Sequence, residues 1–469
     1  MQHQTVLPGF TCQAHGSRAV QADFSAGHVT SDAGALLLRE YEVRHGVLTR
    51  MAACFEDRRT PGRIEFSVGE LVAQRMHGLM LGYEDLNDHD RLRFDPLWAL
   101  LVGREDVEGH DRRDARDRGA PLAGKSTLNR VERSCSAGDR NPRYHKVIAN
   151  FAGLDRLLVE LAIEAAGDRP PRILLDLDAS DVPLHGEQQG RFFHGYYDGY
   201  CYLPLYIFWG EMPVGVRVRR ANIDAAAGCI DELERVVKQL RTQWPGVPIV
   251  IRGDSGFARE SLMAWCEKHA VDYILGLARN PRLQTMLAPA LAKARAKAST
   301  TGGTAREFVE LRYRTEDSWS RTRRVVGKAE VLGEKDNPRF VVTSIGRRLR
   351  GARRLYELEY CARGEAENHI KEQQLDLFGT RMSTSMMPSN QLRAYFSAFA
   401  HAFMVRLRSE TLNNTVLERA TPHTIRLRLL RVGAIVRQSH RRILVSMASS
   451  FPLANVLNAA IARLRPAPA

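Results

Sequence analysis

The sequence predicts an α/β fold with a mixed sheet, and two short strings carry most of this prediction. Residues 174–180 read LLDLDAS and residues 249–256 read IVIRGDSG, so each is an apolar run that ends on a carboxylate. Runs of this length and composition are typical of buried strands. Acids at strand ends lie where an α/β sheet opens its ligand crevice. The third observation is an acid, Glu367, in a charged and helix-like segment, residues 362–376.

The order of the elements narrows the fold class. Residues 31–100 and 126–166 have helical periodicity and predict an all-helical N-terminal region. The elements expected after it are a strand at 173–178, a loop at 186–200, a hairpin from 202–209 and 214–219, a helix at 225–243, a strand at 248–252, a helix at 259–269 and a strand at 272–277. Three strands, a helix and then alternating strand and helix is the order of a ribonuclease-H-like sheet. In that architecture the first and fourth strands are neighbours, so we expect Asp178 and Asp254 to lie side by side.

Residues 300–350 follow a different pattern, because three runs in them alternate with period two between polar turns. They predict a small antiparallel β insertion between Asp254 and Glu367. A helix is expected at 391–410, with an aromatic and apolar face.

Composition limits the function classes. The net charge is +14, and an excess of Lys and Arg favours nucleic acid as partner, because contact with phosphates releases counterions. A merely basic soluble protein is the alternative. No apolar run approaches the roughly 18 residues that cross a bilayer, so no membrane association is expected. Seven scattered cysteines without a Cys-x-x-Cys pair predict reduced thiols in a cytoplasmic protein.

Three acids that converge at one end of a sheet suggest a metal-dependent phosphodiester enzyme. Two divalent ions can activate the attacking oxygen and stabilise the leaving oxygen, and Mg²⁺ prefers carboxylate and water ligands. The candidates for catalysis and metal binding are Asp178, Asp254 and Glu367. Asp176, on the same strand face, is the alternative first acid, and Asp178 is favoured because it is nearer the strand end. Asp181, expected in the loop that follows, is a third candidate. The other interpretation is that these acids only cap helices and turns.

Basic residues near the third acid and in the C-terminal region are the candidates for DNA contact. Arg363, Glu367 and Lys371 share one helix face at i, i+4 and i+8, which fits a metal ligand between two phosphate contacts or a solvated ion-pair face. The last fifty residues hold eight arginines and no acid. Among them Arg426, Arg428 and Arg431 are candidate phosphate contacts, with a solvated basic helix as the alternative.

The chain resembles the DDE transposases of bacterial insertion sequences, in the group with a β insertion before the Glu, and is most similar to the IS thirteen-eighty type. The strings that carry the resemblance are LDLDASD at 175–181, HGEQQG at 185–190, RGDSGF at 252–257 and YCARGEAEN at 360–368. The resemblance implies that Asp178, Asp254 and Glu367 are the catalytic acids. The family signature places Tyr360 and Arg363 beside the Glu. Its final Lys position holds Gln374 here, and Lys371 is the candidate substitute.

The resemblance also implies a reaction and its partners. We expect hydrolysis at the element ends and then attack by the freed 3′-hydroxyl on target DNA, with two Mg²⁺ ions that Mn²⁺ can replace. The partners would be terminal inverted repeats and target DNA, bound by a dimer that assembles on DNA in the cytoplasm, with the nucleoid. The alternatives are a ribonuclease-H-like nuclease that cuts without joining and a catalytically inactive DNA-binding protein.

Five parts are expected along the chain. They are a helical DNA-binding region at 1–168, the first part of the catalytic core at 169–299, the β-rich insertion at 300–350, the second part of the core with the Glu helix at 351–410 and a basic C-terminal region at 411–469.

Overall fold

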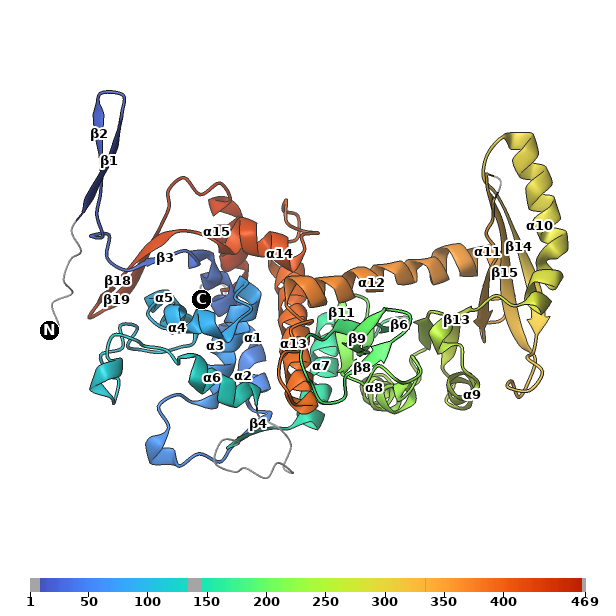
Figure 1. Ribbon diagram of the computed structural model, residues 1–469, viewed down its shortest axis with the longest axis horizontal. Helices are drawn as coiled ribbons and strands as arrows, with labels where there is room; N and C mark the ends of the chain where they lie inside the picture. The colour runs from blue at the N-terminus through green and yellow to red at the C-terminus, as the bar shows by residue number, and fades with distance from the viewer. Residues whose placement is uncertain (1–8, 134–145, 334, 466–469) are drawn as a thin grey trace. The chain divides into compact units, whose positions relative to one another are not determined.

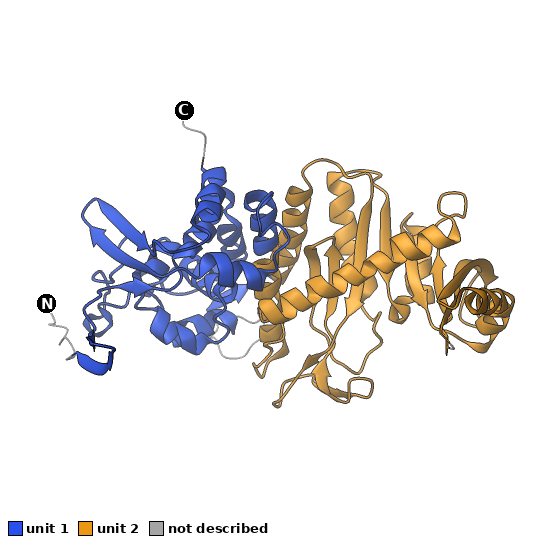
Figure 2. Cartoon of the chain, turned by 90° about the horizontal axis from the view of Figure 1, so that it is seen from above, with its two compact units in different colours: residues 1–150, 403–469 blue, residues 151–402 orange. Residues whose placement is uncertain are grey.

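The computed structural model describes residues 9–133, 146–333 and 335–465. The chain forms two compact units, residues 1–150 with 403–469 and residues 151–402 (Figure 2). The helix α7 (Phe151–Ala166), which the sequence places in the N-terminal part, belongs to the second unit. The division into five parts stays a prediction. Residues 134–145, inside the segment predicted as helical, lie outside the described residues.

The second unit is built on one mixed sheet with the strand order β11-β10-β6-β12-β13-β17-β15-β14, to which β16 is added beside β15 (Figure 1). The first five strands have the ribonuclease-H-like order that the sequence predicts. Strands β10 and β11 run antiparallel next to β6, whereas β12 and β13 run parallel to it. The bounds are β6 (Ile173–Ala179), β10 (Leu205–Trp209), β11 (Met212–Arg217), β12 (Ile249–Gly253), β13 (Asp272–Leu277), β14 (Ala305–Tyr313), β15 (Arg323–Leu332), β16 (Lys335–Asp336) and β17 (Arg339–Thr343).

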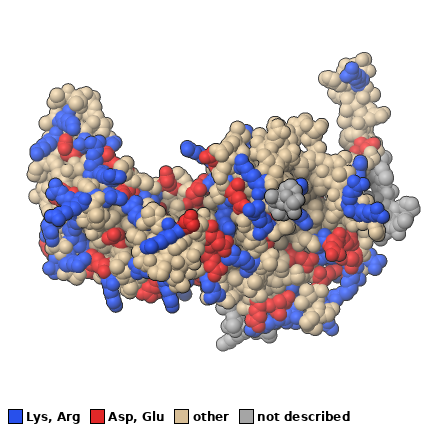
Figure 3. Space-filling model, turned by 180° about the vertical axis from the view of Figure 1, so that it is seen from behind, with Lys and Arg blue, Asp and Glu red and all other residues tan. Residues whose placement is uncertain are grey.

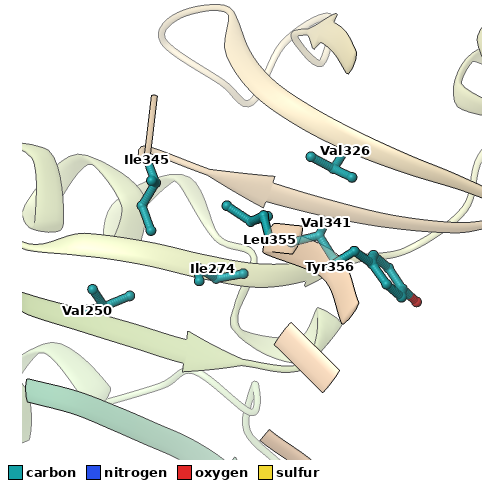
Figure 4. Close-up of a cluster of buried hydrophobic side chains, with 7 residues drawn as sticks. All are labelled: Val250, Ile274, Val326, Val341, Ile345, Leu355 and Tyr356. Carbon is teal, nitrogen blue, oxygen red and sulfur yellow. The ribbon is translucent and has the colours of Figure 1, made fainter. Parts of the chain in front are cut away.

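The β insertion is antiparallel, as predicted, and it continues the core sheet instead of forming a separate one. Strand β17 pairs antiparallel with β13, and β15 and β14 follow it. A buried apolar cluster joins the two parts (Figure 4). It consists of Val250, Ile274, Val326, Val341, Ile345, Leu355 and Tyr356. Because core and insertion share this cluster, the insertion is fixed relative to the strands that carry Asp178 and Asp254.

Helices surround the sheet of the second unit. They are α7, α8 (Cys229–Gln243), α9 (Glu260–Lys268), α10 (Pro281–Thr301), α11 (Ala352–Arg354), α12 (Gly364–Lys371) and α13 (Met387–Thr411). In α8 the buried residues Leu233, Val236, Val237 and Leu240 follow the spacing that predicts it. A π-helical segment, η8 (Glu372–Asp376), continues helix α12, and another, η6 (Leu355–Tyr360), precedes it with the 3-10 helix η7 (Cys361–Arg363) in between. Such segments are frequent at functional sites, and these two flank the helix that carries Glu367.

The segment predicted as a loop at 186–200 contains strands. Strands β7 (Val182–Pro183), β8 (Phe192–His194) and β9 (Gly199–Tyr202) form a small antiparallel sheet. The rings of Phe193 and Tyr200, which face each other across β8 and β9, lie 5.8 Å apart. Aromatic cross-strand pairs stabilise a hairpin, and this effect outweighs the loop preference of the glycines in the segment.

The first unit is mainly helical, with α1 (Leu36–His45), α2 (Val47–Ala52), α3 (Val68–Leu81), α4 (His89–Leu92), α5 (Pro96–Leu101), α6 (Lys125–Glu132), α14 (Pro422–Ile425) and α15 (Ala454–Leu464). Helix α3 begins with a capping box between Ser67 and Glu70 and ends at Gly82, where φ is 90°. Only glycine adopts this left-handed conformation without strain.

The N-terminal region is not all-helical, in contrast to the prediction. Strands β1 (Phe10–His15) and β2 (Arg18–Ala22) form a hairpin, β4 (Phe55–Asp57) pairs with β5 (Val147–Ala149), and β3 (Val29–Thr30) pairs with β18 (Ala434–Ser439), which itself pairs with β19 (Arg442–Met447). The pairings of β3 and β4 join segments far apart in the chain, so local periodicity does not reveal them. Within the described ranges, no helix has the length and apolar character that a bilayer-spanning segment requires.

Candidate active site

Two neighbouring parallel strands bring the predicted aspartates together. In the ladder between β12 and β6, Val250 lies opposite Leu174 and Arg252 lies opposite Asp176. Asp254 and Asp178 come two residues later on each strand, so they reach the same edge of the sheet. Because side chains alternate between the two faces of a strand, both acids face the same side as Arg252 and Asp176. The segment at 352–376 covers this side, since Nη1 of Arg252 donates to the Glu359 carbonyl at 2.7 Å.

The third acid reaches the same place from α12. Nη2 of Arg363 donates to Oε1 of Glu367 at 2.7 Å, and Nη1 of Arg363 lies 3.6 Å from Oδ1 of Asp178. The guanidinium group therefore lies between the strand acid and the helix acid. We call Asp178, Asp254 and Glu367 the acid cluster. Its Glu367 side chain is 46% exposed and that of Asp178 is 20% exposed, so the cluster is open on the side of the helix.

The electrostatics of the acid cluster show an excess of negative charge. Burial raises the pKa of Asp178 to about 6; Arg363 offsets part of this shift, and Asp254 and Glu367 add to it. These interactions indicate that the carboxyl groups of Asp254 and Glu367 lie near that of Asp178. Among the described residues, the ion pairs of this site join one guanidinium group to two of the three carboxylates, so the site is short of positive charge. Carboxylate oxygens are ligands that hard divalent cations prefer. The donor set therefore fits a divalent metal.

Asp254 is held in place by the turn that follows β12. Its Oδ1 accepts a hydrogen bond from the backbone N–H of Gly256 at 2.8 Å, as the cap of the short helix η5 (Ser255–Phe257). This contact fixes χ1 of the aspartate at the end of the strand.

Asp176 has a different role from Asp178. It is 4% exposed, and Arg252 binds it through two hydrogen bonds of 2.7 and 2.6 Å. Such a bidentate pair compensates the carboxylate charge inside the protein. The structure thus brings Asp178 into the acid cluster, whereas Asp176 belongs to a buried ion pair.

Tyr360 lies beside the acid cluster on η6. Burial raises its pKa; Arg363 opposes this shift and Asp254 adds to it, which places the phenol near both groups. A Cβ atom at Gly276 would lie 2.5 Å from the Tyr360 hydroxyl, so only glycine permits this approach. A cavity of about 580 Å³ opens here, lined by Asp254, Ser255, Gly276, Arg279, Arg339 and Tyr360 among others. It provides room for a substrate next to the acids.

The residues after Glu367 are arranged differently from the family signature. Lys371 is exposed on the last turn of α12. Gln374, at the signature Lys position, is buried, and its Nε2 lies 3.3 Å from the hydroxyl of Tyr206. Tyr206 lies opposite Asp178 in the ladder between β10 and β6. Gln374 therefore packs behind the acid cluster, and an exposed lysine one turn earlier is available for a phosphate.

The three C-terminal arginines do not form one surface. Arg426 is buried, and its guanidinium group donates to the Met80 and Leu79 carbonyls at the end of α3. The prediction that Arg426 contacts DNA is therefore wrong, because this side chain caps a helix. Arg431 donates to the Leu81 carbonyl at 2.9 Å and remains partly accessible. Arg428 is exposed, so both of these stay predictions.

Sequence reasoning missed Tyr197, which lies in the segment predicted as a loop at 186–200. Burial raises the pKa of Tyr197 to about 12, and the charges of Asp181, Asp178 and Asp254 contribute. The hairpin of β8 and β9 thus brings a phenol near the acid cluster. It also missed Arg252, although this residue stands in the second of the two strings, two positions before Asp254.

The family of the chain follows from its similarity to a family model. A family model described as the transposase DDE domain, group 1, matches residues 12–469. Among solved structures, the chain is similar to the piggyBac transposase in a cryo-EM synaptic complex with hairpin DNA, with a TM-score of 0.44 and 11% identity over 93% of this chain and 86% of that one. No curated protein matches the chain significantly. Because the family model covers nearly the whole sequence, the chain belongs to the group 1 DDE transposases, metal-dependent enzymes of DNA transposition.

Proposed function

We propose that Asp178, Asp254 and Glu367 bind two Mg²⁺ ions and catalyse cleavage at element ends followed by strand transfer into target DNA. The observation that supports this proposal is the convergence of the three carboxylates from two adjacent strand ends and one helix, with the Arg363 guanidinium group between Asp178 and Glu367. When bound, two divalent ions, Mg²⁺ or Mn²⁺, would activate the attacking oxygen and stabilise the leaving oxygen. The proposal leaves Asp176 out of this set because its carboxylate pairs with Arg252.

The side chains around the acids have distinct tasks in this proposal. Two strands and a helix cap fix Asp178 and Asp254, whereas the more exposed Glu367 completes the set from the helix. In the protein without DNA, Arg363 binds the carboxylates of Asp178 and Glu367. Once cations compensate these acids, a DNA phosphate is its better partner, because a guanidinium group binds phosphate through two parallel hydrogen bonds. Tyr360 and Lys371 would contact the same DNA strand on either side of it.

The charge distribution supports a DNA surface on the insertion. Residues 281–350 hold 16 Lys and Arg against seven Asp and Glu, a net +9 out of +14 for the chain. Figure 3 shows Lys and Arg gathered over α10 and the insertion strands, and mixed with acids elsewhere on the visible face. We infer that this surface and the N-terminal region bind the terminal inverted repeats, with Arg428 and Arg431 as additional contacts. Since each end requires an active site, the working complex would be a dimer assembled on DNA.

The alternatives differ in what they do with a cleaved end. A ribonuclease-H-like nuclease would cut without joining, and a catalytically inactive DNA-binding protein would do neither. The excess negative charge of the acid cluster argues against the inactive protein, since it destabilises the fold unless it binds a cation. The assignment to the IS thirteen-eighty type and the association with the nucleoid remain proposals.

A strand-transfer assay tests the proposal. The full chain is incubated with Mg²⁺, target plasmid and DNA that carries the inverted repeats flanking its gene, either intact or already cleaved. We expect nicks at the element ends and joined products from the cleaved DNA. Cleavage without joining would support the nuclease instead. Unchanged cleavage by an Asp254→Asn variant would show that the site assignment is wrong, and Glu365→Gln is the matched control because Glu365 is exposed on the same helix as Glu367.

A further inference from the structure

A second group of potential metal ligands lies in the same unit as the acid cluster. It consists of His369 on α12, Glu372 on η8 and His401 on α13, and one ligand atom from each lies within 4.8 Å of the others. We call these residues the histidine cluster. His369 and Glu372 stand three positions apart and share a helix face. His369 and Glu367 are two positions apart, about 200° around the helix, so the two clusters lie on roughly opposite sides of α12.

Burial of the histidine cluster leaves polar atoms without compensation. His401 is fully buried. Nδ1 of His369 and Oε2 of Glu372 are buried too, and neither has a hydrogen-bond partner among the described residues. A buried polar atom without a partner costs about 1–3 kcal/mol, so such atoms call for an explanation such as a bound ion. A shared cation would satisfy both atoms at once.

The hydrogen bond of His401 prepares it for a metal. Its Nε2 lies 3.0 Å from the carbonyl oxygen of Glu211, and only a protonated Nε2 can donate to a carbonyl. The neutral ring then keeps its lone pair on Nδ1, which is the form that binds metals. Metal-binding histidines typically donate their second N–H to a backbone carbonyl in this way, because the contact fixes tautomer and ring orientation.

The walls of the histidine cluster also orient the rings. Phe208 on β10 stacks against His369 with centroids 6.3 Å apart and meets His401 edge-on at 5.7 Å. The two imidazole rings are 6.3 Å apart. An aromatic wall limits the access of water and reduces the number of competing ligands.

We propose that His369, Glu372 and His401 form a binding site for one transition-metal ion of the Zn²⁺ type, separate from the acid cluster. Two imidazole nitrogens with one carboxylate are a ligand set for Zn²⁺ and its neighbours in the first transition row, whereas Mg²⁺ prefers oxygen ligands only. Three protein ligands leave a fourth position for water. The ion ties α12 to α13 and so holds the helix that carries Glu367. The proposal of a metal site at the histidine cluster does not rest on the proposed transposase function. Only the consequence for the catalytic role of Glu367 rests on it.

Metal content of the purified full chain is the first measurement. After dialysis against a chelator and addition of ZnCl₂ with excess Mg²⁺, we expect one Zn²⁺ per chain by elemental analysis and a melting temperature raised by several degrees. Co²⁺ in place of Zn²⁺ would give the visible absorption bands of a site with nitrogen ligands. Absence of Zn²⁺ and Co²⁺ uptake by the folded protein would overturn the proposal.

Variants locate the ion. His401→Gln keeps a donor for the Glu211 carbonyl but lacks Nδ1, and Glu372→Gln keeps the shape of the side chain, so both retain the fold better than alanine. We expect each to lose at least tenfold in Zn²⁺ affinity. Asp254→Asn and Glu365→Gln should bind Zn²⁺ like the original chain. If Asp254→Asn abolishes uptake and His401→Gln does not, the ion belongs to the acid cluster and the proposal is wrong.

Hydrogen exchange tests whether bound Zn²⁺ stabilises helix α12 and the segment η8 that follows it. Addition of Zn²⁺ should slow amide exchange in residues 364–376 of the original chain and leave it unchanged in His401→Gln. Equal protection in both proteins would contradict the proposal. This readout needs no DNA and no catalysis, so it fails or succeeds independently of the proposed transposase site.

Discussion

Two acid-rich places in residues 151–402 differ in how their charge is balanced. In the buried network around Asp155, Arg217 binds Asp155 and Glu232 at 2.7 Å each, and Arg235 binds Glu232 at 3.1 Å. Two carboxylates thus face two guanidinium groups. In the acid cluster the ion pairs of the described residues join Arg363 to Asp178 and Glu367, while Asp254 has no guanidinium partner among them. Both places lie against the same sheet, so the difference comes from the side chains and not from the architecture.

The ratio of carboxylates to guanidinium groups affects the pKa values of the acids in the two places. Burial would raise the pKa of Glu232, but hydrogen bonds from Arg217 and Arg235 hold it below its usual value. Burial raises the pKa of Asp178 to about 6, because Arg363 offsets it only in part while two further acids add to it. The network therefore stabilises the fold without any ligand. The acid cluster has fewer cations than carboxylates among the described residues, which is typical of a functional site.

Removing one carboxylate from the acid cluster should have the largest effect. Asp178→Asn should reduce cleavage of element ends by about 10³-fold, since divalent ions contribute several kcal/mol to the transition state. The variant should fold and bind DNA normally, because Arg363 keeps its shorter ion pair with Glu367 when the Asp178 carboxylate is lost. Single-turnover cleavage and a DNA-binding titration measure the two properties. Cleavage within tenfold of the original rate would remove Asp178 from the site.

Substitution of Asp176, the neighbouring acid on β6, should lower the stability of the protein, whereas substitution of Asp178 should lower its cleavage rate. Asp176→Asn leaves the buried Arg252 without its counter-ion, which costs about 3–5 kcal/mol of the free energy of unfolding. Urea denaturation measures this loss. The double variant Asp176→Leu with Arg252→Met should recover most of it, because a buried ion pair is often replaced by apolar residues at little cost. A stable Asp176→Asn protein that cannot cleave DNA would instead make Asp176 the metal ligand.

A substitution in the network around Asp155 should lower the stability of the protein without changing its cleavage rate. Asp155 accepts hydrogen bonds from Arg217 and from the Tyr395 hydroxyl at 2.6 Å. Asp155→Asn weakens two charge-assisted bonds, and we expect a loss of about 1.5–3 kcal/mol in the free energy of unfolding. The cleavage rate of the folded variant should stay within twofold. A large decrease in rate without loss of stability would show that the balanced network also takes part in catalysis.

The sequence was sufficient for what depends on element order. The adjacency of Asp178 and Asp254 follows from the sequence of strands and helices, because only a few sheet topologies accommodate that order. The choice between Asp176 and Asp178 also required the register between strands β6 and β12. Asp176 and Arg252 each stand two residues before an acid of the cluster, so parallel strands in register place them opposite each other. The sequence contains this signal, but it is readable only once the register is known.

Other features could not be derived, because they depend on contacts between distant segments. The insertion extends the core sheet through the pairing of β17 with β13, and nothing in either strand marks that partner. His401 lies 32 residues after His369 on another helix, and its role depends on the carbonyl of Glu211. Arg426 looked like a surface cation, yet its environment is set by the end of α3, more than 340 residues earlier.

The smallest of these effects, the pH dependence of metal binding, tests the comparison most directly. The pKa of Asp178 is about 6 in the folded protein, above the usual 3.8, so the folded protein binds this proton more tightly than the unfolded chain does. The free energy of unfolding of the metal-free protein should therefore fall as the pH rises from about 4 to about 6. Metal competes with the same proton, so Mn²⁺ affinity should be about tenfold lower at pH 5 than at pH 7. Calorimetric titration with Mn²⁺ from pH 5 to pH 7 measures this affinity. The Asp155→Asn variant is the control and should show the same pH dependence of Mn²⁺ affinity as the original chain. An affinity that stays constant from pH 5 to pH 7 would mean that Asp178 is already ionised without metal, and the contrast between the two acid-rich places would disappear.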